Sequence, residues 1–319
     1  MMDFSLWLQP AAQTAVEYPM STHAPLTVDN AAQVTEISGA RCGFITELAW
    51  SRDGLVLAVA HGGGVAMWEG AFGGPPTRTL DIHEGPVKAV AFSPDGYIVA
   101  TAGADMTVRL SVVSSAQGVS VLRGHNDAVN DVAFSRDGSL LASCSADRTI
   151  RVLNLAQTAR RDILTGHGDE VTALDFGVDL LASGSRDGSV RLWRGAQPVG
   201  VLNGHLDWVR EVAFSRDGQW LASCGRDNTV RLWDVTSQQE RALLPHDGDV
   251  RAVAFSPDGR LLASDNHGVV MLWDVTSGAL LARLEGHDKP VLSLAFHPAG
   301  NLLVSGAGDN TLKLWGVAV

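Results

Sequence analysis

The stretch from Gly204 to Asp234 alternates apolar and polar residues in three short runs. The runs are Val209 to Phe214, Trp220 to Ser223 and Thr229 to Trp233. Period-two alternation over runs this short predicts antiparallel strands. Ser215-Arg216-Asp217-Gly218 predicts a tight turn, because Asp caps its own backbone and Gly accepts a positive φ. One such sheet would expose both faces to water, so the pattern has to recur along the chain.

The pattern recurs along nearly the whole chain. A histidine, usually after glycine, occurs at His83, His125, His167, His205, His246 and His287. A tryptophan closes the unit at Trp68, Trp193, Trp233, Trp273 and Trp315, and Ser111 and Leu153 stand in the two remaining places. A period of about forty residues is typical of a four-stranded propeller blade.

These positions recurring together in register make the chain resemble the WD40-repeat family over residues 33–319. The resemblance implies an all-β, seven-bladed β-propeller with four antiparallel strands per blade. It also implies that an N-terminal strand at 33–38 (QVTEIS) completes the last blade, which would otherwise end after its third strand. Such closure removes exposed sheet edges.

Residues 1–32 lie outside the repeat and are expected to form a flexible extension. The alternative is that the apolar residues Phe4, Leu6, Trp7 and Leu8 dock on the propeller or on a partner.

The repeats are not equally complete. The first blade lacks Gly-His and reads HGGGVAMWE before its end, and the second and third lack the tryptophan. In the sixth, SDNHGVVMLW is one residue short, so that His267 falls where an aspartate is expected.

Ser, His and Asp recurring together invite a hydrolase interpretation, because they are the parts of a catalytic triad. Repetition argues against it, since an active site needs one constellation in a pocket. The resemblance instead implies buried chains of hydrogen bonds in which Asp accepts from His, His accepts from the hydroxyl, and the hydroxyl accepts from the indole N–H. The complete sets are His167, Ser183, Asp187 and Trp193; His205, Ser223, Asp227 and Trp233; and His287, Ser305, Asp309 and Trp315.

His61 and His267 are the other histidines that could bind a metal, but no Cys or carboxylate cluster at ligand spacing accompanies them. Exposed turn histidines are the preferred interpretation. No Gly-rich phosphate loop joins a strand to a helix, so we expect no cofactor and no metal.

Composition narrows the function further. The formal net charge of −11 argues against nucleic acid as a partner, which requires a basic footprint. No apolar run is long enough to span a bilayer, and the first residues lack the features of a secretory signal. Cys42, Cys144 and Cys224 are odd in number and are expected to be free thiols. We therefore expect a cytoplasmic protein that is monomeric by itself.

In propellers of the resembled family, partners bind along the top rim, at residues before and within the innermost strands and before the turn Asp. The matching positions here include Arg186, Trp208, Arg210, Arg226 and Arg251, in three consecutive blades. Trp and Arg are enriched at interface hot spots, and clustered Arg suits acidic segments. The opposing interpretation is that these arginines pair with Glu170, Asp249 or Glu211 and merely solvate the rim.

The sequence thus predicts a non-enzymatic scaffold that docks partner proteins or acidic peptide segments. The alternative is a small-ligand or metal binder, or an enzyme, that uses the mouth of the central channel.

Overall fold

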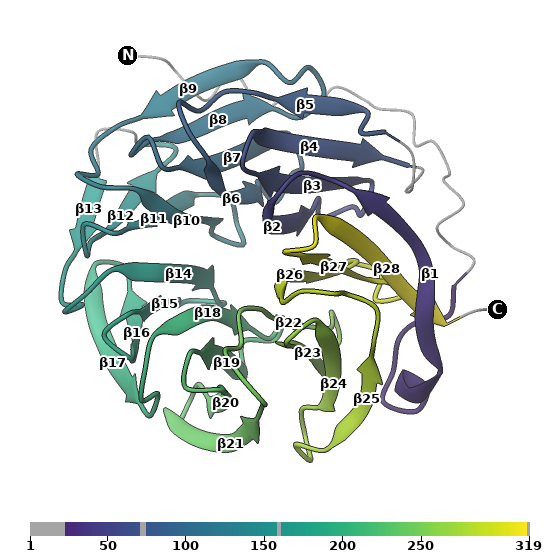
Figure 1. The fold of residues 1–319 in the computed structure, drawn as a ribbon. Helices are drawn as coiled ribbons and strands as arrows, with labels where there is room; N and C mark the ends of the chain where they lie inside the picture. The colour runs from purple at the N-terminus through teal and green to yellow at the C-terminus, as the bar shows by residue number, and fades with distance from the viewer. Residues whose placement is uncertain (1–22, 71–74, 158–160, 318–319) are drawn as a thin grey trace.

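The structure, a computed structural model, describes residues 23–70, 75–157 and 161–317. Seven four-stranded antiparallel sheets are arranged as blades around a central axis (Figure 1). The prediction of an all-β, seven-bladed propeller is confirmed. Helical structure within these ranges is limited to the short 3-10 turn Ala31–Gln33, and no helix there is long and apolar enough to cross a membrane.

Each blade contributes one strand to each of four concentric positions. The innermost strands are β2 (Ile45–Trp50), β6 (Val87–Phe92), β10 (Val129–Phe134), β14 (Val171–Phe176), β18 (Val209–Phe214), β22 (Val253–Phe255) and β26 (Val291–Phe296). The second strands are β3 (Val56–His61), β7 (Ile98–Gly103), β11 (Leu140–Ser145), β15 (Leu181–Ser185), β19 (Trp220–Gly225), β23 (Leu261–Asn266) and β27 (Leu303–Ala307). The third strands are β4 (Gly64–Glu69), β8 (Val108–Val112), β12 (Ile150–Asn154), β16 (Ser189–Arg194), β20 (Thr229–Asp234), β24 (Val269–Asp274) and β28 (Thr311–Val317). The outermost strands are β5 (Arg78–Leu80), β9 (Gly118–Leu122), β13 (Arg161–Leu164), β17 (Gln197–Asn203), β21 (Gln239–Pro245), β25 (Leu280–Leu284) and, in the seventh blade, β1 (Val34–Arg41).

The ring is closed by β1, which lies antiparallel to β28 from Val34 opposite Val317 to Arg41 opposite Thr311 (Figure 1). The predicted closure of the last blade by an N-terminal strand is confirmed, and the strand runs three residues further than 33–38. Residues before it also pack on the ring. Leu26 is buried in the core of the sixth and seventh blades, and its N–H donates to the Gly300 carbonyl at 2.8 Å. The segment Phe4 to Leu8, considered above for docking, lies outside the described residues.

The second strands are buried on both faces because each blade stacks against two neighbours. Strands β15 and β27 are buried along their whole length, whereas the outermost strand β21 is exposed at five of its seven positions. This burial explains why the second strands read as continuous runs of small and apolar residues instead of alternating. The core therefore lies between the blades, divided among them.

The glycine of the Gly-His pair is required by a close approach. A side chain added at Gly204 would lie 2.7 Å from the Arg231 guanidinium and 3.0 Å from the Trp233 ring. These contacts are tighter than ordinary Cβ contacts, so glycine before His205 lets the third strand's Arg and Trp cover this loop without a shift.

A β-bulge near the start of the innermost strands sets the directions of the rim side chains. In β18 the register shifts between Val209 and Glu211, and the same shift occurs in β2, β6, β10, β14 and β26. Bulges of this kind re-aim side chains and increase local twist. Here the residue at the bulge, such as Arg210, is turned toward the next blade.

Candidate partner-binding rim

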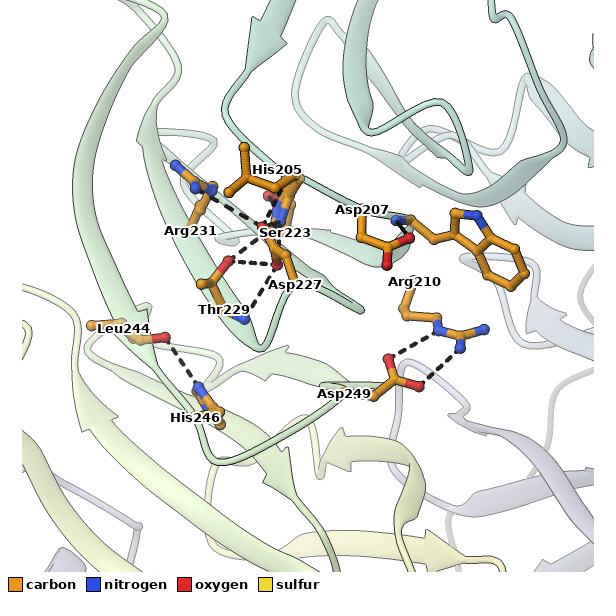
Figure 2. Close-up of polar contacts among 12 residues, drawn as sticks. His205, Asp207, Arg210, Ser223, Asp227, Thr229, Arg231, Leu244, His246 and Asp249 are labelled. Atoms are coloured by element: carbon orange, nitrogen blue, oxygen red, sulfur yellow. Dashed lines mark hydrogen bonds and ion pairs between the residues drawn. The ribbon is translucent and has the colours of Figure 1, made fainter.

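The fifth blade contains a continuous chain of hydrogen bonds (Figure 2). His205 Nδ1–H donates to both carboxylate oxygens of Asp227 at 3.0 Å, and His205 Nε2 accepts from the Ser223 hydroxyl at 2.8 Å. The Trp233 indole N–H donates to the same hydroxyl oxygen at 2.9 Å. Every donor and acceptor in this buried chain has a partner, so none contributes the cost of about 1 to 3 kcal/mol of a buried unpaired group.

The Asp227 carboxylate is the most heavily used acceptor of this chain. It also receives bonds from the Thr229 hydroxyl at 2.8 Å and from the Leu206 backbone N–H at 3.0 Å. Burial would raise its pKa, but the bonds from His205 and Thr229 outweigh burial and lower the pKa to about 2. The Asp227 carboxylate is therefore ionised at any pH well above 2.

The fourth and seventh blades have the same arrangement. In the fourth, His167 contacts Asp187 at 3.1 Å and Ser183 at 2.8 Å, and Trp193 donates to Ser183 at 2.9 Å. In the seventh, the contacts of His287 with Asp309 and Ser305 are 3.1 and 2.7 Å, and Trp315 donates to Ser305 at 2.8 Å. Ser183, Ser223 and Ser305 are all buried, and each hydroxyl also accepts from an indole N–H, so these sets lack the exposed hydroxyl that a catalytic triad presents to its substrate.

The predicted rim residues gather around one indole. The guanidinium carbons of Arg186, Arg210 and Arg226 lie 4.2, 5.3 and 4.9 Å from the centroid of the Trp208 ring. They come from the fourth and fifth blades: Arg186 follows β15, Arg210 is at the bulge of β18, and Arg226 follows β19. Cations within about 6 Å of an indole are attracted by its quadrupole, so the structure brings these four side chains into one cluster.

Each of these arginines also has a carboxylate partner from the chain itself. Arg186 pairs with Glu170 at 2.7 Å, and Arg226 approaches Asp207 at 3.8 Å. Arg210 makes a bidentate pair with Asp249, at 3.1 and 2.8 Å (Figure 2). Arg251 lies 3.2 Å from Asp249, so this carboxylate joins it to the cluster.

The third carboxylate considered from the sequence, Glu211, is not a rim partner. Its side chain is partly buried and accepts from the Val253 backbone N–H of the sixth blade at 2.8 Å. Burial raises its pKa to about 8. The bulge turns the adjacent residues Arg210 and Glu211 in different directions. Arg210 therefore contacts Asp249 on the rim, whereas Glu211 contacts the backbone of the next blade.

Comparison with known proteins identifies the repeat. The family model described as "WD domain, G-beta repeat" matches residues 74–110, 117–154, 159–194, 196–234, 237–274 and 278–316. The chain belongs to the WD40 repeat family. Each matched WD40 repeat begins near the outermost strand of one blade and ends with the third strand of the next, so every repeat ties two blades together. The first blade, which lacks Gly-His, lies outside the matches except for its outermost strand.

Individual relatives match over short stretches. The chain is 42% identical over 74 residues to nuclear distribution protein PAC1-2 of Uncinocarpus reesii and 41% over 75 residues to nuclear distribution protein nudF 2 of Penicillium rubens. It is 39% identical over 71 residues to nuclear distribution protein nudF of Emericella nidulans. The matched stretches span 21 to 22% of this chain and 16% of each relative. These matches show similarity over part of each relative's length only.

Two WD40 blades keep the histidine chain without its tryptophan. In the second, His83 contacts Asp105 at 2.9 Å and Thr101 at 2.8 Å, and the buried hydroxyl of Ser111 has no hydrogen-bond partner among the described residues. In the third, Leu153 stands in the tryptophan's place beside a cavity of about 40 Å³. Both replacements remove the indole donor, and the third blade is also less completely filled beside Leu153.

The hydrogen bonds of the sixth blade differ from those of the other blades. The indole of Trp273 and the ring of His246 still meet at Ser264, with distances of 2.8 and 2.7 Å to its hydroxyl. The other ring nitrogen, His246 Nδ1, lies 3.0 Å from the Leu244 carbonyl (Figure 2). Burial lowers the pKa of His246 to about 4, so the ring is neutral near pH 7 and its Nδ1–H donates to this carbonyl.

The two turn histidines lie in separate blades. His61 is at the end of β3 in the first blade and accepts from the Gly63 N–H at 3.1 Å, whereas His267 is in the turn between β23 and β24 of the sixth. The seventh blade separates them. Within the ranges that the structure covers, no group of three or more His, Cys, Asp or Glu side chains is arranged to hold a metal ion.

Sequence reasoning missed one rim residue, Leu206. Its side chain is 90% exposed, the largest exposure among the large hydrophobic residues that the structure describes. The signal was present in the repeat. The residue after the histidine is Glu84, Asn126, Gly168, Asp247 or Asp288 in the other five blades that carry it, so leucine is the exception at this position.

Proposed function

We propose that this protein is a non-enzymatic interaction scaffold that docks acidic segments of partner proteins on the rim of its fourth to sixth blades. The docking sector consists of Arg186, Trp208, Arg210, Arg226 and Arg251, and is called the Trp208 sector below. The observation that carries the proposal is the gathering of three guanidinium groups around one indole. Aromatic and arginine side chains of this kind dominate the energetics of protein interfaces.

Electrostatics favour an acidic partner segment. The Trp208 sector holds four arginines against the three carboxylates of Glu170, Asp207 and Asp249, on a molecule whose formal net charge is −11. Docking would exchange some of these internal pairs for pairs with the partner. Since exposed ion pairs contribute only about 0.2 to 1 kcal/mol each, we expect binding of modest affinity that weakens as salt is added.

The non-enzymatic part of the proposal rests on the repeated, buried hydrogen-bond chains and on the WD40 family. The similarity to the nuclear distribution proteins supports only the presence of the repeat in this proposal. It supports no shared pathway, because the matches span 16% of each relative. Protein segments remain the proposed partners in place of nucleic acid or membrane. A cytoplasmic location remains part of the proposal, supported by three free cysteines, and so does a protein that is monomeric by itself.

The proposal is tested by affinity capture from a native lysate with wild type and with a variant carrying Trp208→Ala and Arg226→Glu. Arg216→Glu is the matched control, because Arg216 is an exposed arginine of the same blade at the other end of β18. Circular dichroism and thermal unfolding establish that all three proteins are folded. We expect partners that wild type and the control retain and the variant loses. Equal recovery by all three would contradict the proposed sector.

A further inference from the structure

The most exposed large hydrophobic side chain that the structure describes belongs to the loop that carries Trp208. Leu206 follows the buried His205, and its side chain is 90% exposed. Single exposed hydrophobic residues are common and need no explanation by themselves. Leu206 differs because the repeat provides its own controls: the equivalent residues are Glu84, Asn126, Gly168, Asp247 and Asp288.

The fold does not require leucine at this position. What the fold uses there is the backbone N–H, which donates to Asp227 in the fifth blade at 3.0 Å. The equivalent N–H groups of Asn126, Gly168 and Asp288 donate to their own blade's aspartate at 2.9, 2.7 and 3.0 Å. Polar residues and glycine thus occupy the position with the same backbone bond, so a buried-core role does not account for the leucine.

Leu206 belongs to the same rim loop as Trp208, two residues before it in the chain. The loop that carries it is bonded to the next loop by the Arg226 N–H, which donates to the Trp208 carbonyl at 2.9 Å. The side chains of Arg226 and Arg251 are 51% and 40% exposed, against 32% and 26% for Arg186 and Arg210. The loop that carries the exposed leucine therefore also carries the indole over which Arg226 lies, with its guanidinium carbon 4.9 Å from the ring centroid.

We propose that Leu206 is an apolar anchor, and that the segment docked on the Trp208 sector carries a hydrophobic residue flanked by acidic ones. The inference rests on the proposed function and specifies its partner. The hydrophobic residue packs on Leu206 and the Trp208 ring, and the flanking carboxylates meet Arg226 and Arg251. Arg186 and Arg210, with their shorter ion pairs, hold the indole in place.

This division of roles follows from the geometry of the pairs. Arg210 is fixed by two bonds to Asp249, and Arg186 by a 2.7 Å pair with Glu170, so releasing either costs an established contact. Arg226 contacts Asp207 at only 3.8 Å, and Arg251 shares a carboxylate that Arg210 already occupies. The latter two can turn to an incoming carboxylate at the smallest cost.

The experiment measures fluorescence anisotropy with three synthetic peptides of equal length. The first places Leu-Phe between Asp-Glu pairs, the second replaces Leu-Phe by Ser-Ser, and the third replaces the acidic residues by lysine. Each peptide is titrated with wild type, Leu206→Asp, Arg226→Ala, Trp208→Ala and the control Val178→Asp. Leu206→Asp carries the residue that the seventh blade has at this position, Asp288, so its fold is expected to be retained. Val178 is 66% exposed in the turn after β14, at the other end of the strands.

We expect wild type and Val178→Asp to bind the acidic-apolar peptide at least about tenfold more tightly than either other peptide. Leu206→Asp should weaken that binding about tenfold, to the level of the Ser-Ser peptide, and Arg226→Ala should weaken binding of both acidic peptides. Equal affinity of the two acidic peptides, with Leu206→Asp unchanged and Trp208→Ala impaired, would overturn the anchor while leaving the proposed function standing. Absence of binding by every acidic peptide, or binding that Trp208→Ala leaves unchanged, would overturn both.

Discussion

The fifth and sixth blades are neighbours with nearly the same sequence pattern, yet their polar groups are connected differently. In the fifth, Asp227 serves His205, Thr229 and the Leu206 N–H together. In the sixth, where the turn is one residue shorter, these functions are divided. His246 turns to the Leu244 carbonyl, and Asn266 accepts the Asp247 N–H at 2.9 Å.

The aspartate of the sixth blade, Asp265, makes contacts different from those of Asp227. Asp265 is buried between blades and accepts from the Gly268 N–H and from the Val291 N–H of the seventh blade, both at 3.0 Å. Burial raises its pKa to about 6. The innermost strand of the sixth blade also has three residues, against six in the fifth. The histidine of a blade can therefore find a hydrogen-bond partner without the aspartate, here in a blade whose innermost strand is shorter.

The largest effect that tests this comparison is expected from Asp227→Ala. The change leaves His205 and the Thr229 hydroxyl without their acceptor and removes the exposed bond from the Leu206 N–H. Buried groups without partners cost about 1 to 3 kcal/mol each. We expect the free energy of unfolding to fall by about 3 kcal/mol, as measured by urea denaturation. Asn266→Ala, which removes one acceptor in the sixth blade, should cost about 1 kcal/mol. Equal losses of unfolding free energy in the two variants would contradict this expectation, because they would show that the two acceptors contribute equally to stability.

The second effect concerns Glu211, which joins the two blades through the Val253 N–H. Burial raises its pKa from 4.5 to about 8, so the folded protein holds a proton that the unfolded chain releases near pH 4.5. The folded state thus binds more protons between these values, and stability falls as pH rises through this window. Glu211→Gln keeps an oxygen acceptor and cannot ionise.

We therefore expect the melting temperature of Glu211→Gln to rise relative to wild type between pH 6 and pH 8, and the difference to level off above about pH 8. Each unit of pKa shift corresponds to about 1.4 kcal/mol between the protonation states. Thermal scans of both proteins at the same pH values measure this difference, which includes the effect of Glu211 on the neighbouring carboxyls of Asp131 and Asp175. A difference independent of pH would contradict the burial of an ionisable group at this junction.

The smallest effect is expected at the outer face of the two blades, where the fifth has an arginine on its third strand and the sixth has one on its outermost strand. In the fifth blade Arg231 of β20 lies opposite Leu243, whereas in the sixth Met271 lies opposite Arg283 of β25. The Arg283 side chain is 47% exposed and 3.9 Å from Asp247. We expect Arg283→Ala to stay within about 0.5 kcal/mol of wild type in urea denaturation. Arg231 is 11% exposed and pairs with Glu240, so Arg231→Ala should cost about 1 kcal/mol more. The reverse order would show that exposure does not rank these pairs.

Most of the fold could be predicted because the repeat supplies many copies of one pattern. His205, Ser223, Asp227 and Trp233 recur in register with their counterparts in other blades, which made both the number of blades and the members of each chain readable. The candidate rim was less accessible. The sequence placed Arg210 beside a possible partner in Asp249, but it equally offered Glu211, which lies at a junction between blades.

The sequence by itself determined the seven blades, the closing strand and the residues that form the hydrogen-bond chains, because these depend on spacing within a single repeat. Only the tertiary structure decided which carboxylate meets which arginine and where the sixth blade's displaced aspartate goes. Those contacts join residues of different loops and blades, and a β-bulge can turn adjacent side chains in different directions. Their partners are set by the packing of the ring, which no local pattern encodes.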